Sequence, residues 1–295
     1  MTYNPSRRRL LRGVGAAAVA APVAGWLSSC STTDPAGSSD SDSNLLESAR
    51  DSGLLVVAIG NEPPYTKLEG DTVTGAAPDV LRAVANELGI DDLKGEQVAY
   101  ESMIPALKAG RVDVIAAGLF MKQSRCSELG YTEPVIVSTE SYAVPPGNPK
   151  DITTIQDVLD NKDLKIAVLP GAFEEGILES AGVPKSQWVS AANGRGGIDA
   201  VKAGRADAFL LPTLSLDALA EDDSDFEVTD VIEDAPKTGS GAAFEKSETT
   251  MIDEYNKVLK DFITTDEYKE IMDKWGFDPE AATTVSTKEL CKNPG

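Results

Sequence analysis

From Leu54 onward, the chain alternates between short apolar runs and longer segments in which apolar residues recur every three or four positions. The apolar runs lie at 54–59, 112–118, 165–169 and 207–211. Their length and their content of Val, Ile and Leu predict buried β-strands. Because strands that alternate with helices are typical of α/β folds, the pattern predicts an α/β protein.

Three segments have the periodicity of amphipathic helices. In residues 78–89, one face of the helix would carry the apolar residues Val80, Leu81, Val84 and Leu88. Gly89 follows them and is a typical helix stop. Residues 251–263 and 266–276 show a similar spacing. We therefore expect a helix in each of the three segments.

One stretch of sequence occurs twice. "LKAGRVDVIAAG" (107–118) is followed 94 positions later by "VKAGRADAFLLP" (201–212). Both stretches read as a helix end, a glycine cap, an Arg-x-Asp turn and a buried strand. Coincidence in a common helix–strand connection is the alternative, but the repeat favours two similar α/β lobes with one such unit each.

The composition restricts the classes of function. The 295-residue chain has 48 acidic and 27 basic residues, a formal net charge of −21 and no histidine. So acidic a protein repels nucleic acids and anionic membranes, and we expect no nucleic-acid partner. The absence of histidine excludes Ser-His-Asp and Cys-His catalysis and His-ligated metal sites. The length suits two domains of ordinary size.

The first 29 residues are typical of an export signal. A basic start that includes Arg7 to Arg9 precedes an Ala/Gly-rich apolar run and small residues. The arginine cluster resembles a twin-arginine signal, and Leu27 to Cys30 resembles a bacterial lipobox, which implies a lipid on Cys30. We expect residues 30–52 to be a flexible linker. A transmembrane anchor is disfavoured because the run is shorter than the roughly 20 strongly apolar residues of a span.

Two cysteines remain once Cys30 is assigned to the lipobox. Cys126 and Cys291 are an even pair in an exported chain, and we expect a disulfide between them. The alternative is one buried thiol and one near a frayed terminus.

Three motifs resemble those of a known family: "NEPPYTKLEG…TGAAPDVLRAVANELG", "MIPALKAGRVDVIAAG" and "AGRADAFLL". They are similar to the type II periplasmic solute-binding proteins of polar amino-acid ABC importers, over nearly all of residues 52–277. The resemblance implies two α/β lobes joined by two crossing segments, with the ligand clamped between the lobes.

On this resemblance, we place lobe 1 at 53–141 plus 242–295 and lobe 2 at 147–232. The crossing segments would then lie near Ser141–Gly147 and Ile232–Gly241.

Ligands of open α/β sheets bind outside the carboxyl ends of the strands. The candidate residues that follow the predicted strands are Asn61, Glu62, Tyr65, Tyr100, Phe120, Arg125, Gly171, Phe173, Glu174 and Thr213. The resemblance assigns Arg125 to the ligand's carboxylate, and the planar guanidinium fits that bidentate role. A solvated arginine paired with Glu128 is the alternative.

Two positions depart from the amino-acid-binding pattern. Amino-acid binders usually carry an aspartate for the α-ammonium where this chain has Pro212, and a small hydroxyl residue where it has Phe120. Phe120, Tyr65 and Tyr100 together supply three rings. Such rings bind delocalised cations by cation–π attraction, about 0.5–2 kcal/mol each. Any one ring taken alone is better explained as core packing, but the joint position of the three at predicted strand ends favours a binding role.

A more specific resemblance is to ectoine/hydroxyectoine-binding proteins, through "NEPPY", "LKAGRVDVIAAGLF", "SRC", "LPGAFEEG" and "GAAFEK". Ectoine is a cyclic amidine carboxylate. The resemblance implies that Glu62 and Glu174 accept hydrogen bonds from the amidinium, and that the three rings surround it. Glu174 has an alternative role as a first-turn acid of a helix, and Glu175 is an alternative contact.

We therefore expect an exported, lipid-anchored protein on the outer face of the cytoplasmic membrane. It would capture ectoine or hydroxyectoine, a small zwitterion, and deliver it to an ABC permease. It would act as a monomer, with no metal or other cofactor and no catalytic residue, because capture requires only hinge closure. The alternatives are a binder of polar amino acids or another osmolyte, and a cyclohexadienyl dehydratase-like enzyme with Glu62 or Glu174 as general acid.

Overall fold

The computed structural model describes residues 44–221 and 223–294. The expected export signal, the expected lipid attachment at Cys30 and the first part of the expected linker lie outside the described residues. The described chain is a mixed α/β fold, as the sequence predicts, and it has two five-stranded sheets. Its helices include none that is long and apolar enough to cross a membrane.

The first sheet has the strand order β4-β1-β5-β14-β6. Its strands are β1 (Leu54–Ile59), β4 (Asp92–Gln97), β5 (Val114–Ile115), β6 (Leu129–Tyr131) and β14 (Ala243–Glu245). Strand β1 pairs in parallel with β4 and β5, whereas β14 is antiparallel to β5 and β6. The uninterrupted apolar sequence of β1 is explained by this central position, where both faces of a strand are covered.

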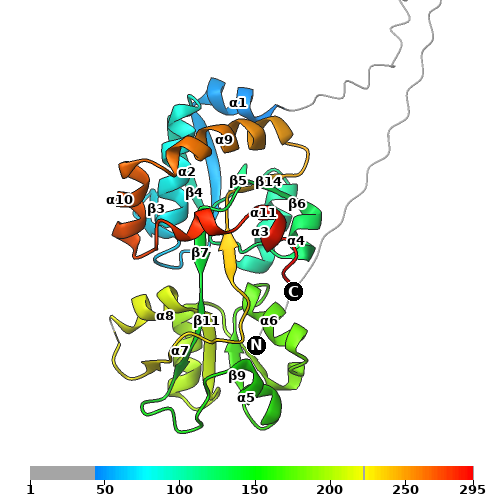
Figure 1. Ribbon diagram of the computed structural model, residues 1–295, viewed down its shortest axis with the longest axis vertical. Helices are drawn as coiled ribbons and strands as arrows, with labels where there is room; N and C mark the ends of the chain where they lie inside the picture. The colour runs from blue at the N-terminus through cyan, green and yellow to red at the C-terminus, as the bar shows by residue number, and fades with distance from the viewer. Residues whose placement is uncertain (1–43, 222, 295) are drawn as a thin grey trace, which may run out of the picture. The chain divides into compact units, whose positions relative to one another are not determined.

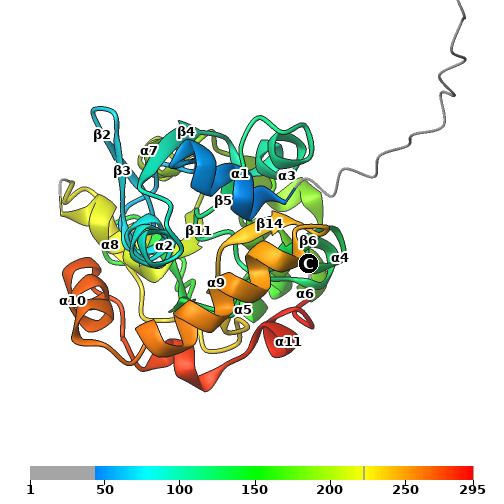
Figure 2. The same ribbon diagram turned by 90° about the horizontal axis from the view of Figure 1, so that it is seen from above.

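Helices from both ends of the chain accompany the first sheet. They are α1 (Leu45–Ser52), α2 (Ala76–Glu87), α3 (Tyr100–Lys108), α4 (Gln123–Glu128), α9 (Thr249–Phe262), α10 (Asp266–Trp275), the 3₁₀ helix η2 (Ala281–Thr284) and α11 (Thr287–Leu290). Strands β2 (Lys67–Glu69) and β3 (Thr72–Thr74) form a separate hairpin. Helix α9 lies beside α1 and α2 (Figure 2). The predicted apolar face of α2 is buried, and α9 and α10 confirm the two helices predicted near the C-terminus.

The second sheet has the order β10-β9-β11-β8-β12. Its strands are β8 (Glu140–Val144), β9 (Ile166–Val168), β10 (Trp188–Ser190), β11 (Ala208–Pro212) and β12 (Glu227–Val228). Its helices are α5 (Ile155–Asp160), α6 (Phe173–Ala181), η1 (Lys185–Gln187), α7 (Gly194–Lys202) and α8 (Thr213–Ala220). The three parallel strands β10, β9 and β11 are followed by the antiparallel β8 and β12. This repeats the arrangement of the first sheet.

The repeated sequence motif occupies the same place in both sheets. Strands β5 and β11 are each the third of five strands. The aspartates that precede them, Asp113 and Asp207, each accept a backbone hydrogen bond from the neighbouring parallel chain segment, at 2.7 and 2.8 Å. The glycines three residues earlier, Gly110 and Gly204, have positive φ values of 63° and 66°. The same sequence therefore produces the same turn and strand twice.

The chain passes between the two sheets at β7 (Ile136–Ser138) and β13 (Thr238–Ser240), which pair antiparallel with each other. Strand β7 runs between the two groups of elements (Figure 1). The expected connection at Ile232–Gly241 contains β13. Most of the other expected connection, Ser141–Gly147, belongs to β8 of the second sheet or follows it, so this connection lies earlier in the chain.

Residues 45–52, expected in the flexible linker, form helix α1 instead. Leu46 and Ala49 are buried, and Gly53 ends the helix with a φ of 69°. The linker prediction is therefore wrong for these eight residues. The physical reason is that the Ser/Asp-rich composition ends at Asn44, after which two leucines and an alanine supply an apolar face that packs with α9 and β1.

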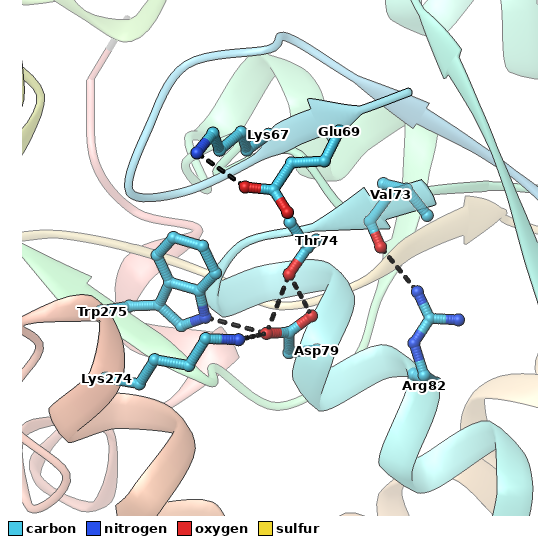
Figure 3. A network of polar contacts seen from close by, with 8 residues as sticks. All are labelled: Lys67, Glu69, Val73, Thr74, Asp79, Arg82, Lys274 and Trp275. Carbon is cyan, nitrogen blue, oxygen red and sulfur yellow. Dashed lines mark hydrogen bonds and ion pairs between the residues drawn. The ribbon is translucent and has the colours of Figure 1, made fainter. Parts of the chain in front are cut away.

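A polar network fixes α10 against α2. Asp79, in the first turn of α2, accepts hydrogen bonds from Thr74 Oγ1 at 2.9 Å and from Trp275 Nε1 at 2.9 Å. Lys274 Nζ lies 3.0 Å from the same carboxylate (Figure 3). One half-buried acid thus joins the β2–β3 hairpin, α2 and the end of α10.

Candidate functional site

A cavity lies where residues that follow strands of the two sheets meet. Glu62, Tyr65, Tyr100, Gly118, Phe120 and Arg125 line it from the first sheet, and Leu169, Ala172, Phe173, Glu174, Leu211 and Pro212 line it from the second. Seven of the ten candidate residues that follow the predicted strands are therefore brought together here: Glu62, Tyr65, Tyr100, Phe120, Arg125, Phe173 and Glu174.

Arg125, on the short helix α4, is the buried cation of this cavity, with 4% of its surface exposed. Its Nη1 donates to the Phe120 carbonyl and its Nη2 to the Gly171 carbonyl, both at 2.7 Å. Desolvation lowers the pKa of Arg125, but an arginine keeps its charge under such conditions. A guanidinium has five N–H groups, so three remain for an anion at the cavity. The alternative pairing with Glu128 is not formed, because Glu128 pairs with Lys108.

The C-terminal tail holds α4 in place. A disulfide joins Cys126, which follows Arg125, to Cys291 at the end of α11. The backbone N–H of Gln123 also donates to the Asn293 carbonyl at 3.0 Å. The position of Arg125 is therefore fixed by residues that lie far away in the sequence.

The rings of the cavity contact one another edge to face. Phe120 lies between Tyr65 and Phe173, with ring centroids 5.7 and 5.9 Å apart. The Tyr65 hydroxyl bonds to the Ser138 hydroxyl, and the Tyr100 hydroxyl donates to the Ala117 carbonyl at 3.1 Å. These hydroxyl contacts fix two of the predicted rings at the cavity wall. On the side of the first sheet, the wall of the cavity is therefore largely aromatic.

Glu62 and Glu174 approach the cavity from opposite sheets. Ser215 on α8 donates to a Glu62 carboxylate oxygen at 2.6 Å, and burial raises the pKa of Glu62. Glu174, in the first turn of α6, is 2% exposed. Burial raises the pKa of Glu174 to about 7, and the negative charge of Glu62 adds to the effect. Glu175 does not line the cavity, and one of its carboxylate oxygens accepts from the Gly171 N–H at 2.8 Å.

Gly171 allows the two sides of the cavity to approach closely. Its φ is +72°, and a Cβ at this position would lie 2.6 Å from the Glu101 Cα on helix α3. The Arg125–Gly171 hydrogen bond and the Glu62–Ser215 hydrogen bond join the same two sides. Through these contacts, elements that accompany the first sheet touch elements that accompany the second directly, and the cavity between them is closed.

Thr213, like the candidates Asn61 and Gly171, does not line the cavity. Its hydroxyl bonds to the hydroxyls of Thr139 and Ser141, both at 2.9 Å, which joins the start of α8 to the start of β8. The sequence reasoning missed Ser138, Ser215 and Glu140 around the cavity. Only Glu140 has a visible signal, because it is an acid inside the otherwise apolar and neutral stretch 135–144.

The comparison with family models decides the class of protein. The model described as bacterial extracellular solute-binding proteins, family 3, matches residues 54–278. The chain belongs to this family. It is thus a solute-binding protein of an ABC importer for amino acids or related solutes, and the family is extracytoplasmic.

Individual relatives of this family-3 protein cover most of its length. It is 33% identical, over 84% of its own chain and 86% of the relative, to a probable amino-acid ABC transporter periplasmic-binding protein of Sinorhizobium fredii. It is 25% identical to the arginine-binding extracellular protein ArtP of Bacillus subtilis, over 75% and 85% of the two chains. A crystal structure of EhuB in complex with hydroxyectoine matches with a TM-score of 0.80 and 36% identity, over 84% and 98% of the chains.

Proposed function

We propose that this family-3 protein captures ectoine or hydroxyectoine outside the cytoplasm and delivers it to the permease of an ABC importer. The observation that carries the proposal is the composition of the cavity: aromatic walls, one buried arginine and two buried or half-buried acids. These groups complement a small ring with a delocalised cation and a carboxylate. The 36% identity to EhuB, whose structure contains hydroxyectoine, supports the same choice.

In this proposal, each predicted residue has a separate task. Arg125 binds the carboxylate with N–H groups that its carbonyl partners leave free. Glu62 and Glu174 accept N–H groups of the amidinium, while Tyr65, Tyr100 and Phe120 contact the ring faces. Because these residues belong to elements of both sheets, a bound solute favours the closed arrangement over an open one.

The binding of a polar amino acid is the second candidate, since the relatives include probable or known amino-acid binders. Pro212 lines the cavity where amino-acid binders usually present an aspartate, which disfavours this candidate. A dehydratase-like activity has no support among the full-length relatives reported above, and it would appear as turnover of a cyclohexadienyl acid.

A calorimetric panel tests the proposed ligand. Ectoine, hydroxyectoine, glycine betaine, proline, glutamate, glutamine and arginine are titrated into the protein, and thermal unfolding is measured with each. A ligand at 100 times its Kd stabilises the folded state by about 2.7 kcal/mol. We expect this shift with ectoine or hydroxyectoine. Binding of amino acids alone would show that the ectoine assignment is wrong.

Arg125→Ala tests the proposed carboxylate contact. We expect it to weaken ectoine binding at least 100-fold, because the change removes a charge-assisted bidentate pair in a buried site. Arg205→Ala is the matched control, since Arg205 is exposed in the turn before β11. Equal affinities of the two variants would mean that the carboxylate is held elsewhere.

We also propose that the protein is anchored by a lipid on Cys30. The support is the signal-like sequence of residues 1–30. Incorporation of labelled palmitate into the wild-type protein, and its loss in Cys30→Ala, is the expected result. Unlabelled wild-type protein in the soluble fraction would contradict the anchor.

A further inference from the structure

Among the residues that the structure describes, the second sheet contributes one aromatic ring to the cavity, Phe173, to which the binding scheme above gives no task. Phe173 is the first residue of α6, and 2% of its surface is exposed. It lines the cavity together with Tyr65, Tyr100 and Phe120, which all accompany the first sheet. The ring of Phe173 therefore reaches the cavity from the side opposite to the other three.

Phe173 extends a chain of edge-to-face contacts between rings. Phe277, just after α10, contacts Tyr65 with ring centroids 5.0 Å apart, and Tyr65 contacts Phe120 at 5.7 Å. Phe120 contacts Phe173 at 5.9 Å, with the ring planes at 80° to each other. This last contact joins the two sides of the cavity, so it forms only when they are together. Edge-to-face pairs of this kind are favourable beyond the area that they bury.

Hydrogen bonds on both sides of Gly171 fix the segment that carries Phe173. Arg125 Nη2 donates to the Gly171 carbonyl at 2.7 Å, and the Gly171 N–H donates to a Glu175 carboxylate oxygen at 2.8 Å. Phe173 follows two residues later, at the start of α6. Its ring is thus held near the arginine that would bind the ligand's carboxylate. A group that is already held in place loses little conformational freedom when a solute binds.

The residues around Phe173 restrict the chemistry of the solute. On this side of the cavity, the described chain otherwise supplies four apolar residues and one acid: Leu169, Ala172, Leu211, Pro212 and Glu174. No serine, threonine, asparagine or glutamine among the described residues lines the cavity. Burial of a polar group without a hydrogen-bond partner is costly, so a solute with a polar group on this side is disfavoured. Glu174 allows one exception, a group with an N–H to donate.

We infer that Phe173 is a further specificity-determining residue of the site: it completes the aromatic enclosure from the second sheet and selects a compact cyclic cation whose edge towards this sheet is apolar apart from an N–H group. This inference rests on the proposed function, since it assumes that the aromatic walls enclose a ring-shaped solute. Core packing is the alternative role, because Phe173 also belongs to the large apolar core. The two roles differ in how removal of the ring changes ligand affinity.

The ring of Phe173 acts on the closed state in two ways. It covers the bound solute from the side of the second sheet and excludes water, which strengthens the attraction between the cation and the surrounding rings. It also contacts Phe120, so a solute that holds the two sides together gains this aromatic contact as well. Because both effects belong to the closed state, loss of the ring should speed dissociation more than it slows association.

Phe173→Leu tests the inference, because it removes the ring and keeps an apolar side chain at this position. Calorimetric titration with ectoine should give a Kd about 3- to 30-fold above that of wild type, the range expected for one cation–π contact. Phe209→Leu is the matched control, since Phe209 is a buried ring of β11 in the same sheet and does not line the cavity. It should lower the melting temperature and leave the Kd of ectoine as in wild type.

A double-mutant cycle with Phe120→Leu separates contact with the solute from mere support of the Phe120 ring. If Phe173 contacts the solute, the double variant binds ectoine more weakly than Phe120→Leu alone. Equal affinities of these two proteins would mean that Phe173 acts only through Phe120, which overturns the inference. Thermal unfolding checks that each variant folds, and Phe173→Met, with an unbranched apolar side chain, replaces Phe173→Leu if that variant does not.

The outcomes separate this inference from the proposed function. Ectoine binding that Phe173→Leu weakens no more than Phe209→Leu overturns the inference and leaves the function intact. Proline is also a compact ring with a cationic nitrogen and an apolar edge, so proline binding that depends on Phe173, without ectoine binding, supports the inference and refutes the ectoine proposal. Glutamine binding tighter than that of ectoine and proline refutes both, and so does the absence of binding by all three solutes.

Discussion

Gly171→Ala should weaken ligand binding without disturbing the fold of either sheet. Gly171 has a φ of +72°, and a Cβ there would lie 2.6 Å from the Glu101 Cα and 2.7 Å from the Glu101 backbone nitrogen. These neighbours are backbone atoms of helix α3, which cannot rotate away as a flexible side chain would. The two sides of the cavity would have to separate by close to 1 Å to reach an ordinary van der Waals distance.

Such a separation would break or stretch the hydrogen bonds that cross the cavity. The Arg125–Gly171 bond is 2.7 Å long and the Glu62–Ser215 bond 2.6 Å. Each involves a charged group and is worth about 1.5–3 kcal/mol. Losing one of these hydrogen bonds, or weakening both, would destabilise the closed state by roughly 2–4 kcal/mol. Because 1.4 kcal/mol corresponds to tenfold, we expect Kd to rise about 30- to 1,000-fold.

Gly182→Ala is the matched control for backbone strain. Gly182 ends α6 with a φ of +83°, and a Cβ there would meet nothing within 4 Å. It therefore carries the same left-handed strain of about 1–2 kcal/mol without a clash. Both variants should lose similar thermal stability in the absence of ligand, and only Gly171→Ala should lose affinity in calorimetric titrations with ectoine. Equal affinities of the two variants would refute the closure argument.

Three further predictions concern stability. Cys126→Ser, which breaks the disulfide to Cys291, should lower the free energy of unfolding by about 2–5 kcal/mol, and added reductant should leave that variant unaffected. Asp79→Ala should cost about 2–4 kcal/mol in denaturant unfolding because three contacts lose their acceptor (Figure 3), whereas the exposed Asp71→Ala should cost less than about 0.5 kcal/mol. Because the pKa of Glu174 is about 7 in the folded protein and near 4.5 in the unfolded chain, its contribution to stability is complete below pH 4.5 and is lost as the pH rises to 7, by up to about 1.4 kcal/mol per unit. A melting temperature of Glu174→Gln with the same pH slope as wild type would contradict this last prediction.

Much of the fold follows from local patterns. The strand β1 and the helices α2, α9 and α10 appear where the periodicity predicts them. The spacing of their apolar residues matches the period of one type of element, and that element buries those residues. The repeated Gly-Arg-x-Asp turn also forms twice, because its hydrogen bonds reach only the adjacent strand. The boundary before α1 was missed because a short helix depends on packing with α9 rather than on its own propensity.

The sequence by itself determined which side chains follow the strands, and hence most of the cavity lining, including Arg125, Phe120 and Glu174. Only the tertiary structure decided how those side chains are partnered. Ser215 reaches Glu62 across 153 positions of sequence, and Arg125 reaches the Gly171 carbonyl across 46. No local pattern encodes such distances, because they depend on how two separately formed sheets meet. The charge balance of the site is therefore a property of the closed fold, although each of its charges is visible in the sequence.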